Sequence, residues 1–160
     1  MIHDGGADIY DIETRTFEKQ DTAVVRRRMA ASELTSWLSG VYGTVALHLQ
    51  RIGVTAVGQP FARYHARDGH VDVEAGLPTA ERITTKDAVK SSSLPAGPAA
   101  VTWHRGTPDE LEQAFEALQA WMERTGVEPV GAPWAIHHIN PIELPEDNSW
   151  TTEVVQPIRD

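Results

Sequence analysis

The chain has 160 residues, no cysteine and a formal net charge of −9 at pH 7. The missing cysteines exclude a disulfide framework, a thiolate zinc site and a cysteine nucleophile, and the acidic balance argues against nucleic acid or a membrane surface as partner. Because no apolar run reaches membrane-spanning length and the N-terminus lacks a signal-peptide pattern, we expect a single cytoplasmic domain over residues 1–160, with no oligomeric state indicated.

The first half of the chain predicts four strands. Alternating apolar and polar residues indicate strands at 9–17 and 22–29. Two further strands, 59–67 and 70–77, flank an Asp-Gly pair at 68–69, which is a strong signal for a tight turn. The second pair of strands is therefore expected to form a hairpin.

A long helix is predicted between these strand pairs. Apolar residues repeat at steps of three and four over residues 32–52, which gives one continuous apolar face. Gly53 follows and can cap the helix in a left-handed conformation. Gly40 and Gly43 weaken the helix and would allow another element to approach it closely.

The second half repeats this plan. Residues 107–110 (TPDE) combine an N-cap threonine, a proline in the first turn and a capping-box glutamate, which predicts a helix that ends at Gly126. The remaining elements are expected to be strands at 87–93, 99–104, 130–139 and 150–158, with a loop at 141–148.

Two octapeptides 73 residues apart indicate an internal duplication. Residues 58–65 (GQPFARYH) align with residues 131–138 (GAPWAIHH), and an Arg-x-Gly-Val segment precedes each of them at 51–54 and 124–127. The chain therefore predicts an α+β fold of two pseudo-symmetric β-α-β-β units. Their helices would pack on an antiparallel sheet, with a ligand cleft between approximate halves 8–84 and 85–160.

The second half also carries a family resemblance. Residues 101–111 (VTWHRGTPDEL) resemble a strand-to-helix entry, and residues 140–145 (NPIELP) followed by 150–157 (WTTEVVQP) are similar to a closing D-P-x-E-x-P … T-E-I-x-x-P-V pattern. In this order, over about residues 8–158, the motifs resemble the GyrI-like small-molecule-binding family, which includes effector-binding domains of drug-responsive transcription regulators.

The resemblance implies a function in binding. A stand-alone member would bind planar hydrophobic compounds, neutral or cationic, in an aromatic-lined cleft, and would serve as a multidrug or xenobiotic binder. Two alternatives stay open: hydrolysis of strained cyclopropane rings in alkylating natural products, as in similar enzymes, and a gyrase-inhibitor-like interaction through the acidic surface.

Side-chain alternation assigns the octapeptides to two faces. Tyr64 and His137 are expected on the same cleft-facing side, and they are the preferred polar contacts for a ligand. Relatives commonly carry a Glu-x-Tyr motif where this chain has Ala135, Ile136 and His137, so the resemblance places Ala135 where a ligand-facing carboxylate is expected. Without that acid, binding is favoured over catalysis, and the candidate catalytic groups of a hydrolase reduce to His137 and Tyr64.

Other residues could complete the cleft. If an acid enters it from elsewhere, the candidates are Glu153, Asp72 and Glu74. Aromatic side chains could stack on a planar ligand, although the helical apolar stripe on which Trp37 lies favours a core role for it. The aromatic candidates for ligand binding are Phe61, Trp134, Trp103 and Trp37.

No metal site or cofactor is expected. His137 and His138 are adjacent on a predicted strand, so their side chains point to opposite faces and cannot easily share one ion. The other histidines lack ligand spacing, and there is no phosphate-binding glycine loop.

Overall fold

The computed structural model describes residues 10–84, 88–138 and 151–160. Eight strands form a single antiparallel sheet, and two helices pack on it, each entered through one turn of 3-10 helix (η1, Ala31–Glu33; η2, Pro108–Glu110). The strands are β1 (Glu13–Phe17), β2 (Gln20–Ala30), β3 (Phe61–Ala66), β4 (His70–Pro78), β5 (Lys90–Leu94), β6 (Gly97–Arg105), β7 (Trp134–His138) and β8 (Thr151–Pro157). The helices are α2 (Leu34–Ile52) and α3 (Glu112–Thr125).

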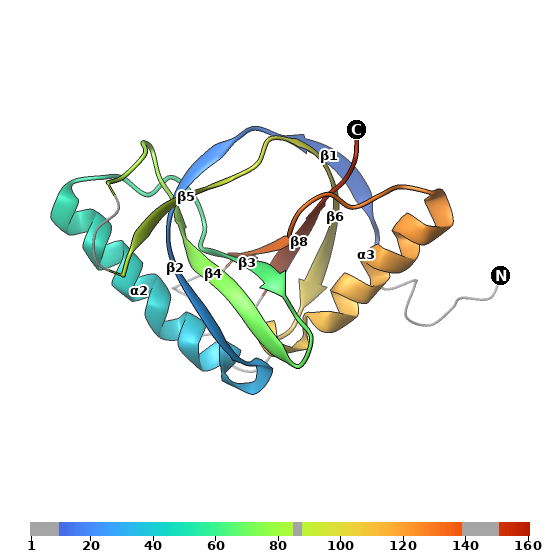
Figure 1. Ribbon diagram of the computed structural model, residues 1–160, viewed down its shortest axis with the longest axis horizontal. Helices are drawn as coiled ribbons and strands as arrows, with labels where there is room; N and C mark the ends of the chain where they lie inside the picture. The colour runs from blue at the N-terminus through green and yellow to red at the C-terminus, as the bar shows by residue number, and fades with distance from the viewer. Residues whose placement is uncertain (1–9, 85–87, 139–150) are drawn as a thin grey trace.

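The sheet is strongly curled, and both helices lie against its outer face (Figure 1). The strand order is β1-β6-β8-β7-β3-β4-β2-β5, so the central neighbours β3 and β7 come from different halves of the chain. The helices form a V whose N-terminal ends approach each other (Figure 1). The predicted α+β fold with helices on an antiparallel sheet is confirmed.

A pseudo-two-fold axis passes between β3 and β7. Ala62 pairs with Ala135 at the centre of this register, and Phe61 with Ile136 mirrors Arg63 with Trp134. Each half contributes an outer strand to the other half, because β1 pairs with β6 and β5 pairs with β2. The sequence predicted these strands but not this exchange, which joins the halves at both edges of the sheet.

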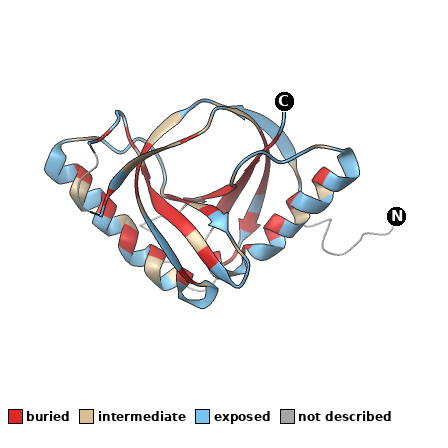
Figure 2. Cartoon of the chain, viewed as in Figure 1, coloured by how far each residue is buried: buried red, intermediate tan, exposed pale blue. Residues whose placement is uncertain are grey.

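Two cores follow from the alternation of side chains. The larger lies between the sheet and the helices and contains Leu38, Val45, Leu118 and their neighbours. The smaller lies on the inner face of the curled sheet, around Phe61 and Trp134. In Figure 2 the buried residues of each helix form the stripe that faces the sheet, as the predicted helical periodicity requires.

Glycines end both helices as predicted. Gly53 (φ 74°) and Gly126 (φ 75°) adopt the left-handed conformation that a side chain would strain. The expectation for Gly40 and Gly43 is wrong, because a Cβ at either position would meet nothing within 4 Å. Both are on the helix surface, away from the packed stripe.

Gly76 is the glycine that a close approach requires. A Cβ at this position would overlap the backbone carbonyl of Ala23 on β2, and no side-chain rotation relieves a clash with backbone. The equivalent position in the second half, by strand register, is Val155. The two halves therefore differ in how closely adjacent strands approach.

Most predicted boundaries are correct to within a few residues, but β1 begins at Glu13 and β7 at Trp134, later than predicted. Pro129 instead forms an isolated bridge with Ile158, and residues 130–133 form an irregular segment with a bend at Gly131 that leads into β7. The predicted loop at 141–148 lies outside the described residues. Neither described helix is long and apolar enough to cross a membrane.

Candidate functional site

The pseudo-two-fold axis places two polar aromatic residues beneath the helices. Tyr64 on β3 and His137 on β7 both point toward the helix-facing core, on either side of the Ala62–Ala135 pair. Tyr64 is 3% exposed and His137 is fully buried. We call this region, where β3 and β7 meet under the two helices, the seam.

Each of these residues packs against an aromatic ring from the helix of the opposite half. The Tyr64 ring lies 5.3 Å from the Phe115 ring of α3 in an edge-to-face arrangement, and the His137 ring lies 6.1 Å from the Tyr42 ring of α2. The two contacts are equivalent, because Tyr64 and His137 are 73 positions apart and so are Tyr42 and Phe115. The duplication thus produces two matching aromatic contacts, one phenyl–phenol and one phenol–imidazole.

The hydroxyls of Tyr42 and Tyr64 are buried and have no hydrogen-bond partner among the described residues. In contrast, His137 Nδ1 lies 3.0 Å from Thr152 Oγ1 on β8. Leaving a buried hydroxyl unpaired costs free energy, so such groups in a folded protein call for a physical explanation.

The polar groups of the seam are neutral at physiological pH. Burial raises the pKa of Tyr64 and raises that of Tyr42 well above its usual range, where the nearby Tyr64 adds a smaller effect. Burial lowers the pKa of His137 to about 3, with a further contribution from His138. The seam therefore offers two hydroxyls and a neutral imidazole, and at pH 7 this imidazole is a weak base.

An open pocket of about 570 Å³ lies beside Tyr64, between the end of β3, residues 131–133 and the start of α3. Its wall includes the ion pair between Arg67 and Glu112, with Nη1 of Arg67 2.8 Å from the carboxylate. The Arg67 guanidinium also lies 4.0 Å above the Phe115 ring. The ion pair thus lies between solvent and the Tyr64–Phe115 contact.

The inner face of the sheet carries a different arrangement, with two buried carboxylates at pseudo-equivalent positions. Glu74 contacts His65 Nε2 (2.6 Å) and accepts a hydrogen bond from Ser92 (2.8 Å). Glu153 contacts His138 Nε2 (3.1 Å) and forms an ion pair with Arg15. Both carboxylates tie their own half to the outer strand that the other half contributes.

The residues predicted to bind a ligand divide between the two faces. Tyr64, His137 and Ala135 lie together in the seam, and Trp37 packs against the same core from α2. The inner face holds Phe61 and Trp134, both almost fully buried, together with Glu153 and Trp103. Trp103 is 47% exposed and lies 5.1 Å from His138.

No carboxylate of the described residues enters the seam. Asp72 is held on the surface by a bidentate contact with Arg26 (2.9 Å), and Glu74 and Glu153 belong to the inner face. For the aromatic neighbours Tyr42 and Phe115, the sequence predicts either stacking on a ligand or, from the apolar stripe of each helix, a place in the core. The structure places both in the seam. The 73-residue offset shows that these two residues are equivalent to each other, but not that they contact His137 and Tyr64.

The prediction that the side chains of His137 and His138 point to opposite faces of the sheet is confirmed. His137 is buried under α2, whereas His138 lies on the inner face. In the part of the chain that the structure describes, no group of three acidic or histidine side chains could hold a metal ion.

A curled antiparallel sheet with two pseudo-symmetric helices on its outer face defines an α+β domain built from a duplicated unit. The GyrI-like small molecule binding domain matches the chain over residues 10–159. The chain belongs to this family. A comparison with curated proteins finds no match.

Solved structures share this fold at low sequence identity. The crystal structure of the EcmrR C-terminal domain has a TM-score of 0.81 at 18% identity and covers 95% of this chain and 99% of its own. The EcmrR chain in the structure of the EcmrR–DNA complex is also similar, with 18% identity and a TM-score of 0.81. The match covers 94% of this chain but only 58% of the EcmrR chain.

Two further structures are similar in fold. A hydrolase from Listeria innocua has 14% identity and a TM-score of 0.62 over 93% of this chain and 92% of its own. SAV2435, solved bound to tetraphenylphosphonium, has 9% identity and a TM-score of 0.65 over 93% of this chain and 94% of its own.

Proposed function

We propose that this protein binds small, planar, hydrophobic molecules in the seam, and that the preferred ligands are neutral and carry a hydrogen-bond acceptor. The observation that supports the proposal most directly is the pair of buried, unpartnered hydroxyls of Tyr42 and Tyr64. A ligand carbonyl or similar oxygen could accept from one of them. The pocket beside Tyr64 offers a route of entry.

Charge supports a neutral ligand over a cation. Moving a cation out of water is costly unless a carboxylate faces it, and Ala135 supplies none. The acids that could have replaced it, Glu74 and Glu153, are engaged on the inner face. The role proposed for the protein in the cell is sequestration of such compounds in the cytoplasm, as a multidrug or xenobiotic binder.

Ring hydrolysis receives less support. It would need His137 or Tyr64 to move a proton near pH 7, and burial shifts the pKa of each away from that range. A gyrase-inhibitor-like interaction rests on the acidic net charge alone.

A matched pair of probes tests the proposal. N-methylacridone is planar and neutral and carries a carbonyl acceptor, whereas N-methylacridinium is a planar cation of similar size without one. Isothermal titration calorimetry should show tighter binding of the acridone. Tyr64→Phe should weaken binding of the acridone by about three- to ten-fold, the usual worth of one hydrogen bond, and should leave binding of the acridinium nearly unchanged.

Trp103→Phe serves as a control. Because Trp103 lies on the inner face, this substitution should leave the affinity for both probes unaltered. Tighter binding of the cation would contradict the neutral assignment. Failure of both probes, and of a broader panel of aromatic dyes, to bind would overturn the proposal as a whole.

A further inference from the structure

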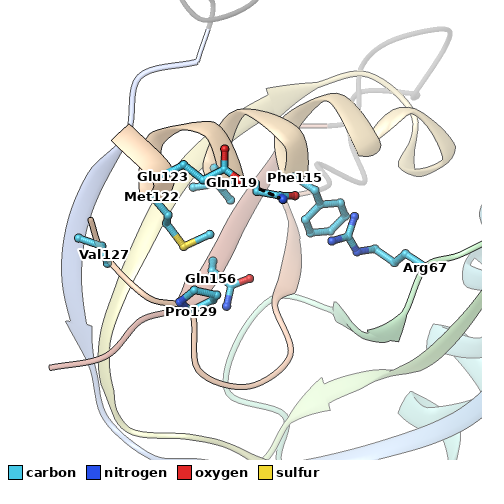
Figure 3. Close-up of a pocket in the computed structure, with 9 residues that line it drawn as sticks. Arg67, Phe115, Gln119, Met122, Glu123, Val127, Pro129 and Gln156 are labelled. Carbon is cyan, nitrogen blue, oxygen red and sulfur yellow. Dashed lines mark hydrogen bonds between the residues drawn. The ribbon is translucent and has the colours of Figure 1, made fainter. Parts of the chain in front are cut away.

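A second pocket, of about 300 Å³, lies between α3 and the sheet (Figure 3). It shares Phe115 with the seam and Arg67 with the pocket beside Tyr64, and its other lining residues are separate from both. Its volume is at the lower end of the range for small-molecule sites. Its apolar walls come from Phe115, Leu118 and Met122 of α3 and from Val127 and Pro129 of the following segment. The flexible Met122 side chain can adapt to different ligand shapes.

Gln156 on β8 supplies a buried polar group to this pocket. Its Nε2 atom donates to the carbonyl oxygens of Gly131 (3.2 Å) and Pro157 (2.8 Å), so both amide hydrogens are used and the orientation of the amide is fixed. Within the described part of the chain, nothing donates to its Oε1. The pocket thus combines apolar walls with one fixed acceptor.

The first half has no such acceptor at the equivalent place. By strand register the counterpart of Gln156 is Leu77, a buried member of the core beneath α2. Val45 and Leu49, which correspond to Leu118 and Met122, are buried in the same core. Ile83 and Val89, from the segment after β4, join it as well. A polar glutamine at this position is therefore not a requirement of the fold.

The charges at the rim disfavour an anion. Arg67 is already paired with Glu112, and Glu123 adds a negative group that accepts a weak hydrogen bond from Gln119 (3.4 Å). A neutral ligand avoids both the cost of burying a charge and repulsion by Glu123.

We propose that this pocket, which we call the α3 pocket, is a second binding site for a small neutral aromatic compound that donates one hydrogen bond to Gln156 Oε1. The donor would be an N–H or O–H group, and the ring would lie against Met122, Leu118 and Phe115. The α3 pocket offers a hydrogen-bond acceptor to a ligand, whereas the tyrosine hydroxyls of the seam offer donors.

Indole and benzofuran test this assignment, because they match in size and shape but only indole carries an N–H donor. The ¹⁵N-labelled full chain would be titrated with each probe and followed by amide chemical shifts. We expect both probes to shift signals from α3 and the segment around Val127, and indole to bind about three- to ten-fold more tightly.

Two variants sharpen the result. Gln156→Leu, which introduces the residue found at the equivalent position in the first half, should remove the preference for indole. Val127→Phe should weaken both probes by narrowing the pocket without touching Gln156, so the test survives if the first variant folds poorly. Equal affinities of the two probes for the unaltered protein, or shifts confined to Tyr42 and Tyr64, would overturn the proposal. Neither outcome bears on the acridone experiment at the seam.

Discussion

The two halves of the sheet share one backbone plan but differ in the chemistry at equivalent positions. Tyr64 in the first half corresponds to His137 in the second, and Leu77 corresponds to Gln156. Ser92, which donates to Glu74, corresponds to Arg15, which forms an ion pair with Glu153. The first half has a phenol, an apolar side chain and a neutral hydroxyl contact at these places, whereas the second has an imidazole, an amide and an ion pair. A duplicated fold thus leaves each copy free to acquire its own site.

The largest expected difference between the halves concerns backbone spacing. Gly76→Ala places a methyl group against the carbonyl of Ala23, so we expect a loss of about 4 kcal/mol in the free energy of unfolding, above the usual cost of overpacking. Val155→Ala, at the equivalent place, should cost about 2 kcal/mol through lost apolar contact. Urea denaturation measures both. Equal, small losses would show that β2 and β4 can separate freely.

Acid should destabilise the protein through His137. The unfolded state binds a proton near pH 6.5, whereas the folded pKa is about 3, so the contribution is complete above pH 6.5 and is lost as the pH falls toward 3. The loss should be on the order of 3 kcal/mol by pH 4. His137→Asn should flatten this part of the stability curve relative to the unaltered protein.

Tyr64 should produce the opposite dependence. Its pKa is raised in the folded state, so the stability it contributes is present below about pH 10 and is lost as the pH rises further. Tyr64→Phe should remove the loss of stability at alkaline pH without altering the loss of stability at acid pH. His137→Asn should remove the loss at acid pH and leave the loss at alkaline pH. If His137→Asn loses as much stability at acid pH as the unaltered protein does, the imidazole is not buried in its neutral form.

The smallest expected difference lies between the two carboxylates. Glu153→Gln should cost about 1–2 kcal/mol, because the buried side chain loses its charge opposite Arg15. Glu74→Gln should cost less, about 0.5–1 kcal/mol, because a glutamine can still accept from Ser92. Thermal unfolding at pH 8 compares them. A larger loss for Glu74→Gln would show that the halves do not differ as the contacts indicate.

Much of the fold could be predicted from local patterns. Helical periodicity located α2 and α3, and the glycines at 53 and 126 marked their ends. The octapeptide repeat identified β3 and β7 and placed Tyr64 and His137 on one face. These features depend on side-chain spacing along a short segment, which the sequence states directly.

The candidate site was predicted less completely. The sequence grouped Phe61, Trp134, Trp103 and Glu153 with Tyr64 and His137, although the sheet places these two sets on opposite faces. Alternation within the octapeptides already separates Phe61 and Trp134 from Tyr64 and His137. For Trp103 and Glu153, on other strands, alternation does not say which face of one strand continues that of another. That relation depends on pairing register, which arises from contacts distant in the sequence.

By itself, the sequence determined the duplication, the two helices, the α+β class and the absence of an acid at Ala135. Only the tertiary structure decided that β1 and β5 exchange halves, that Tyr42 and Phe115 complete the seam, and that Gln156 faces a pocket where Leu77 fills a core. The reason is physical. Local periodicity determines an element and its faces. The burial of a side chain and its hydrogen-bond partners depend on elements that are distant in the sequence and meet only when the strands pair and the sheet curls.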